Sequence, residues 1–156
     1  MGKPDTIYFV RHAKAGERRL WTADDTERPL SKRGWRQSEA VAKRLAAHGA
    51  TALYSSEYVR CMQTLEPLGK LLGVDVTPEP RLFEDEPFEP VLDLLTEVED
   101  GAVLCSHGDI IPATIQALHR RGMAIDTPAD WGKASTWVLR RKGDKITKGK
   151  VWPAPC

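Results

Sequence analysis

The chain has 156 residues, of which 41% are hydrophobic and 29% charged, so it is long and apolar enough to bury the core of one globular domain. This composition excludes collagen-like, fibrous and disordered chains. The 23 Lys and Arg residues nearly balance the 22 Asp and Glu residues, and a formal net charge of +1 argues against a surface built for a nucleic acid polymer or a membrane.

Strands and helices are predicted to alternate along the first half of the chain. In chain order they are a strand over residues 5–10, a helix over 31–48, a strand over 52–54, a helix over 57–72 and a strand over 74–77. The first strand is a near-continuous apolar run, which is typical of a strand buried on both faces. Gly49 is a good residue to end the first helix, and Ser55 and Ser56 are candidate N-caps for the second. We expect that second helix to be kinked or interrupted at Pro67.

The second half of the chain continues the alternation after a proline-bounded loop at residues 78–87. The predicted elements are an amphipathic helix over 88–99, a strand over 102–105, a helix that runs to about Arg121, and the two strands of a terminal hairpin over 135–141 and 145–152. Strands that alternate with helices indicate an α/β fold with a mostly parallel sheet and helices on both faces. We therefore predict a three-layer α/β/α architecture with a C-terminal β-hairpin, as one domain over residues 1–156.

Charge is unevenly distributed along the sequence. Residues 1–60 hold 12 basic and 7 acidic side chains, residues 61–109 hold 2 and 12, and residues 110–156 hold 9 and 3. Two interpretations fit this pattern: charged groups scattered over a solvated surface, or positive charge from both ends of the chain that meets at one anion-binding site.

The cysteines and the N-terminal sequence predict a cytoplasmic protein. Cys61, Cys105 and Cys156 are odd in number and lack C-x-x-C spacing, which argues against a disulfide framework and against a cysteine zinc site. The apolar run at residues 7–10 is too short for a signal peptide, and no stretch approaches the roughly 18 apolar residues of a membrane span. Residues 14–29 are expected to form a charged loop inside the domain.

Three of the predicted strands end in residues that carry chemistry. In chain order, these residues are Arg11-His12, Ser55-Ser56 with Arg60 one turn later, and Ser106-His107. The carboxyl ends of parallel strands meet at one edge of a sheet, where α/β proteins place their sites. Any one of these histidines alone has an ordinary structural interpretation, but together they predict a single pocket.

Phosphate is the ligand that this pocket fits best. Arg60 in the first turn of a helix opposes the helix dipole, unless an anion binds there to both the arginine and the backbone N–H groups. The planar fork of an arginine binds phosphoryl oxygens in pairs. Gly108, next to His107, permits the close approach of another group or a positive φ angle.

Four motifs in the same order resemble those of the histidine phosphatase (phosphoglycerate mutase-like) superfamily. They are Arg11-His12-Ala13, Ser55-Ser56-x-x-x-Arg60-Cys61-x-Gln63-Thr64, Arg81-Leu82-x-Glu84 and Ser106-His107-Gly108. The lack of long insertions, together with Arg28-Pro29-Leu30-Ser31-x-x-Gly34, resembles the small SixA-type branch. The chain is also similar to the phosphatase-like domain fused behind some MutT-type Nudix hydrolases, as three further segments indicate: residues 11–16, Asp24-Asp25-Thr26 and Lys133-x-Ser135-Thr136-Trp137.

The resemblance implies a two-step phosphoryl transfer without a cofactor or a metal. His12 would attack phosphorus and become a phosphohistidine, which water then hydrolyses. Arg11, Arg60 and His107, the last protonated when phosphate is bound, would hold the three non-bridging oxygens. In the SixA-like branch the residue that matches Arg28 adds a contact, although a solvated loop position is an equal alternative for this arginine.

The resemblance assigns the general acid to Glu84, which would protonate the leaving oxygen. Asp85 or Glu86 could take this role instead, because the three acidic residues are consecutive. Ser56 is either an N-cap or a phosphate contact. Lys14 is a candidate for substrate binding, and the other residues that could shape substrate choice are Arg18, Arg19, Trp21 and Lys133.

One position departs from the family pattern. Ala13 stands where the family normally has glycine, and its methyl group would lie near the phosphate or shift the loop. We expect the site to tolerate alanine, because it is the smallest alternative to glycine.

The preferred function is therefore a metal-independent phosphatase. Its predicted partners are a phosphohistidine protein or a small phosphorylated metabolite or nucleotide, with no nucleic acid polymer and no membrane, and the chain is expected to be a monomer or weak dimer. The alternative is a non-catalytic phosphate-sensing or interaction module with the same fold. A mutase is not expected, because the chain lacks the insertions that would enclose a sugar phosphate.

Overall fold

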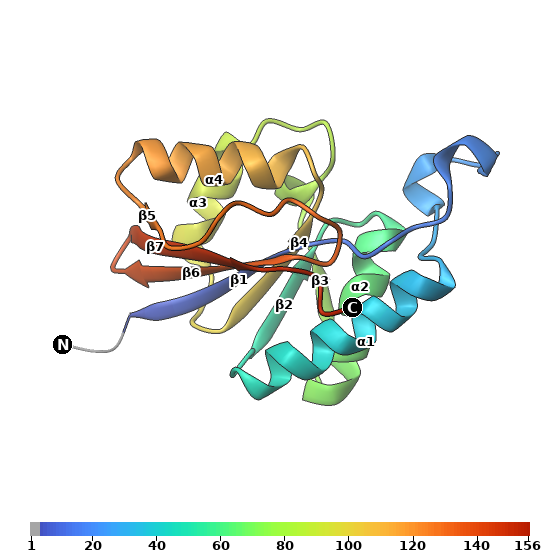
Figure 1. Ribbon diagram of the computed structural model, residues 1–156, viewed down its shortest axis with the longest axis horizontal. Helices are drawn as coiled ribbons and strands as arrows, with labels where there is room; N and C mark the ends of the chain where they lie inside the picture. The colour runs from blue at the N-terminus through green and yellow to red at the C-terminus, as the bar shows by residue number, and fades with distance from the viewer. Residues whose placement is uncertain (1–3) are drawn as a thin grey trace.

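The computed structural model of the protein describes residues 4–156 as a central sheet with helices on both of its faces (Figure 1). The strands are β1 (Asp5–Arg11), β2 (Ala52–Ser55), β3 (Val76–Pro78), β4 (Ala102–Ser106), β5 (Ala124–Ile125), β6 (Thr136–Lys142) and β7 (Lys145–Trp152). The helices are α1 (Lys32–Ala47), α2 (Val59–Leu72), α3 (Glu89–Glu97) and α4 (Ile110–Arg120), and the short 3-10 helices are η1 (Arg18–Leu20), η2 (Asp25–Glu27) and η3 (Pro80–Leu82).

The sheet contains seven strands in the order β3-β2-β4-β1-β6-β7-β5. The four strands from β3 to β1 are parallel, and β6 runs antiparallel to both β1 and β7. The predicted three-layer α/β/α architecture and the C-terminal hairpin of β6 and β7 are therefore confirmed. Gly143 lies in the hairpin turn with a φ of 59°, a conformation that glycine adopts without strain.

The apolar side chains of strand β1 belong to two hydrophobic clusters, one on each face of the sheet. Ile7 and Phe9 point into the hydrophobic cluster that includes residues of α3 and α4. Tyr8 and Val10 point into the opposite cluster, which includes residues of α1 and α2. Figure 1 shows α3 and α4 on one side of the sheet and α1 and α2 on the other. Successive side chains of a strand alternate between faces, so a strand covered on both sides is apolar throughout.

Three predicted details of the helices and strands are wrong. Helix α2 begins at Val59 with Tyr58 at its N-cap position, rather than at residue 57 with a serine cap. The helix is not interrupted at Pro67, which was one of the two predicted alternatives, and the burial of Leu65 and Leu68 on either side stabilises this helical turn against the loss of one hydrogen bond. Strand β3 begins two residues later than predicted, at Val76.

Short elements account for the remaining differences between prediction and structure. Strand β5 has only two residues and pairs with β7, so it has no detectable sequence period. The charged loop at residues 14–29 contains η1 and η2, and the proline-bounded loop contains η3. Within residues 4–156, none of the helices is long and apolar enough to span a membrane.

Candidate active site

The register of the parallel strands brings the predicted site residues to one edge of the sheet. Arg11 at the end of β1 pairs with Ser106 at the end of β4, and Ser55 of β2 pairs with Cys105. The sequence motifs that follow three separate strands therefore begin side by side. The first backbone N–H beyond β1, that of His12, donates to the carbonyl of Ser106 at 3.1 Å.

His12 is held as a neutral imidazole. Its side chain is 6% exposed, and its Nδ1 atom lies 2.8 Å from the backbone carbonyl oxygen of Ala13. Because a carbonyl only accepts, this contact assigns the ring proton to Nδ1 and leaves a lone pair on Nε2. The pKa of His12 is lowered to about 3, chiefly by burial and also by the nearby charges of Arg60, Arg11 and Lys133, against the opposing effect of the carbonyl. A neutral histidine with a free Nε2 lone pair has the form that a nucleophile requires.

Ala13 connects the nucleophile to helix α2. Its backbone N–H donates to Thr64 Oγ1 at 2.9 Å, and the Thr64 hydroxyl donates to the carbonyl of Arg60 at 2.6 Å. The methyl group of Ala13 is fully buried in the cluster on the α1 and α2 side of the sheet. It therefore packs into the core, which is consistent with the expected tolerance of alanine at this position.

His107 lies against His12 and is completely buried, with 5.5 Å between the two ring centroids. Its Nε2 atom lies 2.9 Å from Ser56 Oγ, and that hydroxyl accepts a hydrogen bond from the N–H of Tyr58 at 3.3 Å. The serine hydroxyl can donate to Nε2, and in that orientation the ring proton of His107 lies on Nδ1. The pKa of His107 is lowered to about 2, chiefly by burial, and the charges of Arg60 and Arg11 act in the same direction. Without a bound anion His107 is therefore neutral.

The two predicted arginines at the strand ends are anchored through their terminal nitrogens. Arg11 donates from one Nη atom to the carbonyl of Trp131 at 2.6 Å. Arg60 is fully buried, and its two Nη atoms bind the backbone carbonyl and the carboxylate of Asp25 at 2.9 and 3.1 Å. Both guanidinium groups are thus fixed in orientation, while their Nε atoms have no hydrogen-bond partner within residues 4–156.

Unpartnered polar atoms concentrate in this region. Among residues 4–156, five buried side-chain nitrogen or oxygen atoms have no hydrogen-bond partner, and three of them are Arg11 Nε, Arg60 Nε and His107 Nδ1. Leaving a buried donor unsatisfied costs on the order of 1–3 kcal/mol, more for a charged group. An anion with several oxygens would satisfy these donors, so they mark a site built for a ligand such as phosphate.

A cavity of about 500 Å³ lies at this edge of the sheet, with Arg11 and His12 in its lining and Arg60 and His107 buried outside that lining. Its lining includes Arg11, His12, Lys14, Arg28, Glu84, Gly108 and Lys133. The predicted substrate-binding residues Lys14, Arg28 and Gly108 therefore lie around the same opening as the predicted nucleophile. Ser56 is instead fully buried next to His107, where its hydroxyl contacts the imidazole.

Gly108 is required by the position of Arg11. A Cβ atom built on Gly108 would lie 2.7 Å from Arg11 Cζ and 2.8 Å from one Nη atom. The expectation that glycine here permits a close approach is therefore confirmed, and the group that approaches is the guanidinium of Arg11.

Glu84 is the member of the acidic run that faces the cavity. Its carboxylate lies 3.1 Å from an Arg60 Nη atom and 3.5 Å from an Arg18 Nη atom, and it is partly buried. Asp85 and Glu86 are exposed. The backbone N–H of Asp85 donates to the Asp109 carboxylate at 2.8 Å. Asp85 has a φ angle of 66°, which turns the chain at this point. This turn separates Glu84 from its two neighbours, so the geometry favours Glu84 for the role of the acid.

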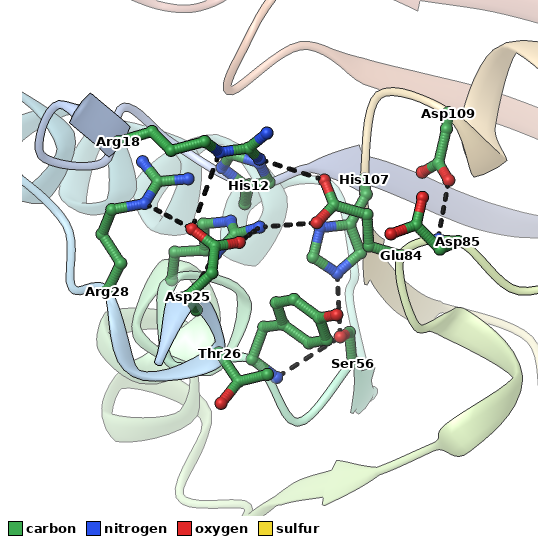
Figure 2. A network of polar contacts seen from close by, with 12 residues as sticks. His12, Arg18, Asp25, Thr26, Arg28, Ser56, Glu84, Asp85, His107 and Asp109 are labelled. Atoms are coloured by element: carbon green, nitrogen blue, oxygen red, sulfur yellow. Dashed lines mark hydrogen bonds and ion pairs between the residues drawn. The ribbon is translucent and has the colours of Figure 1, made fainter. Parts of the chain in front are cut away.

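Arg28 is a buried residue, which excludes the alternative of a solvated loop position. Its side chain is 7% exposed, and its Nε donates to Asp25 at 2.9 Å while an Nη atom donates to the carbonyl of Gly16. Figure 2 shows Arg28, Arg18 and Glu84 gathered around the carboxylate of Asp25, in front of His12. Three of the basic residues of segment 1–60, namely Arg11, Arg28 and Arg60, therefore lie at one site, in agreement with the second interpretation of the charge pattern.

Asp25, Thr64 and Tyr58 are parts of the site for which the sequence suggested no role. Tyr58 packs on His107 with 4.6 Å between ring centroids and lies under the Arg60 guanidinium at 4.8 Å. Two signals for a role of Asp25 were available: the segment Asp24-Asp25-Thr26 is one of those that resemble the Nudix-fused domain, and Asp25 and Arg28 lie three residues apart in a charged loop. Across residues 4–156, no group of three or more His, Cys, Asp or Glu residues is arranged to hold a metal ion.

Comparisons with known proteins identify the family of this chain. Residues 7–86 match the sequence model of the histidine phosphatase superfamily (branch 1). The chain is 38% identical over 140 residues to an 8-oxo-(d)GTP phosphatase of Mycolicibacterium smegmatis, covering 86% of this chain and 44% of that protein. It thus spans less than half the length of the curated relatives it matches.

Solved structures show the same fold. A SixA protein from Agrobacterium tumefaciens aligns with a TM-score of 0.71 at 24% identity, over 94% of this chain and 97% of that one. The protein histidine phosphatase SixA in complex with tungstate aligns with a TM-score of 0.73 at 21% identity, over 91% and 92% of the two chains. These similarities confirm the resemblance seen in the four motifs, and they support the expectation of a phosphate-hydrolysing enzyme. The chain belongs to the histidine phosphatase superfamily.

Proposed function

We propose that this protein is a metal-independent phosphatase that works through a phosphohistidine formed on His12. The observation that carries the proposal is the set of three unpartnered donors, Arg11 Nε, Arg60 Nε and His107 Nδ1, beside a neutral imidazole. Donors fixed in advance around the position of a phosphoryl group stabilise the charge that develops during transfer, because they need no reorganisation at the moment of reaction.

In the first step, Nε2 of His12 attacks phosphorus while the bond from phosphorus to the leaving oxygen or nitrogen breaks. Glu84 gives its proton to that leaving atom, which departs as part of an imidazole, an alcohol or a shortened phosphate chain, according to the substrate. In the second step, water attacks the phosphohistidine and the bond between phosphorus and nitrogen breaks. The ionised Glu84 takes a proton from this water, so that phosphate is released and both residues return to their starting forms.

The substrate in this proposal is a phosphohistidine protein or a small phosphorylated metabolite or nucleotide. Similarity to a relative named 8-oxo-(d)GTP phosphatase supports the nucleotide, and the fold shared with SixA supports the phosphohistidine protein. Lys14 and Lys133 at the cavity opening suit a substrate that carries negative charge beyond the reacting phosphoryl group.

A substrate panel tests the activity. We expect phosphate release from at least one of a phosphohistidine protein, nucleoside di- and triphosphates, sugar phosphates and a phosphoserine peptide, with full activity in EDTA. Loss of activity in EDTA would contradict a metal-independent reaction. Release from none of these substrates, with phosphate still bound, would favour the alternative of a phosphate-sensing module.

Trapping tests the intermediate. The wild-type protein, quenched after incubation with a ³²P-labelled donor, should carry acid-labile phosphate on His12, and His12→Ala should carry none and lose activity by roughly a thousandfold or more. His48→Ala is the matched control, because His48 is exposed and lies on the helix end next to Ala47, away from the cavity. Hydrolysis by His12→Ala at the wild-type rate would overturn the proposal.

A further inference from the structure

The charged loop between β1 and α1 places one carboxylate, that of Asp25, against two of the arginines in the site. One oxygen of Asp25 accepts from Arg28 Nε at 2.9 Å, and the other accepts from an Arg60 Nη atom at 3.1 Å. The backbone carbonyl of Asp25 accepts from the second Arg60 Nη atom at 2.9 Å. Asp25 therefore supplies two of the contacts that orient the Arg60 guanidinium, beside the contact from Glu84 at 3.1 Å, and it joins this group to that of Arg28.

These contacts differ from ordinary ion pairs at a protein surface. Arg60 is fully buried and Arg28 is 7% exposed, whereas exposed pairs are screened by water and contribute little. A buried guanidinium requires a nearby negative charge and acceptors for its N–H groups. The Asp25 carboxylate provides both to Arg60 and Arg28 at the same time. Removing Asp25 would leave both arginines without their main partner.

The loop is itself held in the conformation that presents Asp25. Asp24 caps the 3-10 helix η2 by accepting from the N–H of Thr26 at 2.9 Å, and the indole N–H of Trp21 donates to the carbonyl of Asp24 at 2.8 Å. Arg18, in η1 of the same loop, reaches both Asp25 at 3.6 Å and Glu84 at 3.5 Å. The network thus extends from the loop to the residue proposed as the acid (Figure 2).

Asp25 does not take the place of the phosphoryl group. It occupies the Nη atoms of Arg60, whereas the Nε atom of that arginine, together with Arg11 Nε and His107 Nδ1, stays unpartnered in the part of the chain that the structure describes. The carboxylate therefore binds the Nη atoms of this guanidinium and leaves its Nε atom without a partner. This is the arrangement of a supporting residue rather than of a competing anion.

We propose that Asp25 is a positioning residue, which holds Arg60 and Arg28 in the orientation that binds the transferred phosphoryl group. This inference rests on the proposed phosphatase function. It adds a third residue of the loop at 14–29 to the site, beside Lys14 and Arg28, so that this loop completes the site. Displacement of a binding group by about 1 Å is enough to slow a reaction by roughly 100-fold, which sets the scale of the expected effect.

Three variants test the proposal. Asp25→Asn keeps the size of the side chain but removes its charge and places an N–H₂ group against an arginine, so we expect kcat/KM to fall by roughly 10- to 100-fold. Asp25→Glu keeps the charge and should recover part of this loss. Glu27→Gln is the matched control, because Glu27 is exposed on the same 3-10 helix and makes no ion pair within residues 4–156. It should leave kcat/KM within about twofold of the wild type.

Binding of tungstate and of inorganic phosphate, measured by calorimetry, provides a readout that a purely structural role would not change. We expect Asp25→Asn to weaken both by roughly tenfold in protein that is still folded, as thermal unfolding will show. Equal or tighter binding with unchanged kcat would overturn the proposal, and tighter binding would identify Asp25 as a competing anion. If Asp25→Asn does not fold, Asp25→Glu decides: unchanged kcat and unchanged anion affinity would overturn the positioning role. Because anion binding is measured without turnover, failure of the phosphatase function would be seen separately, in the wild type.

Discussion

The Nδ1 atom of His12 lies 2.8 Å from the carbonyl oxygen of Ala13, so the nucleophile is oriented by the backbone of the next residue. The carbonyl of Ala13 shares its peptide group with the N–H of Lys14, which donates to Gln37 Oε1 at 3.0 Å, so this peptide group is held in place. Many catalytic histidines are oriented by a carboxylate, which would favour the protonated ring. A neutral carbonyl fixes the tautomer without stabilising the charged imidazolium to the same degree. The pKa of His12 is therefore free to fall under the influence of burial and the neighbouring cations.

His12 should remain neutral far below the ordinary range for histidine. Its pKa is lowered to about 3, so the ring stays unprotonated at Nε2 from pH 8 down to about pH 4. Imidazole ¹⁵N NMR spectra should show the Nδ1–H tautomer throughout that range, with His12→Gln used to assign the signals. A protonation midpoint near pH 6.5 would contradict this expectation.

Stability should decline as the pH falls from 7 to 5. His12 and His107 have pKa values lowered to about 3 and about 2 in the folded protein, so the unfolded chain takes up protons first, from about pH 6.5 downward. Each histidine can reduce the free energy of unfolding by up to about 1.4 kcal/mol per pH unit in this window. Urea unfolding at pH 7, 6 and 5 measures the slope. His107→Gln should make it shallower, and an unchanged slope would show that His107 is not buried as a neutral ring.

Gly108→Ala should impair the site by displacing Arg11. The added Cβ would lie 2.7 Å from the Cζ atom of Arg11, so the guanidinium must move. We expect kcat/KM to fall by roughly 10- to 100-fold, since a displacement of about 1 Å has effects of this size. The same substitution in an Arg11→Ala background should have little further effect, because the group that it displaces is absent. Additive losses in the double variant would contradict this explanation.

Ala13→Gly should restore the family residue at a cost in stability and with little gain in activity. The Ala13 methyl group is fully buried in the core cluster beside α1 and α2. Deleting it and adding backbone freedom should lower the free energy of unfolding by roughly 1–2 kcal/mol. Steady-state kinetics should show kcat within about threefold of the wild type. A rise of tenfold or more would mean that the methyl group does obstruct the phosphoryl group.

Much of the fold was predictable from local patterns. The apolar run at residues 5–10 and the turn at 142–144 identified the first strand and the terminal hairpin, because burial and turn chemistry act over a few neighbouring residues. Strand β5 and the start of α2 were not predictable in this way. Two residues carry no period. Ser56 does not cap α2, which has Tyr58 at its N-cap position, and the Ser56 hydroxyl instead contacts His107, which follows β4.

The site divides along similar lines. The sequence alone determined the family, the sheet edge where the motifs meet, and the candidates Arg11, His12, Arg60 and His107. This was possible because local sequence shows where a strand ends, and the carboxyl ends of parallel strands lie at one edge of the sheet. Only tertiary packing could distinguish Glu84 from its acidic neighbours, assign Gly108 to the approach of Arg11, and bring Asp25 to Arg60 across 35 positions of sequence. Such contacts depend on how the loop at residues 14–29 folds back over the sheet edge, and no local pattern encodes that path.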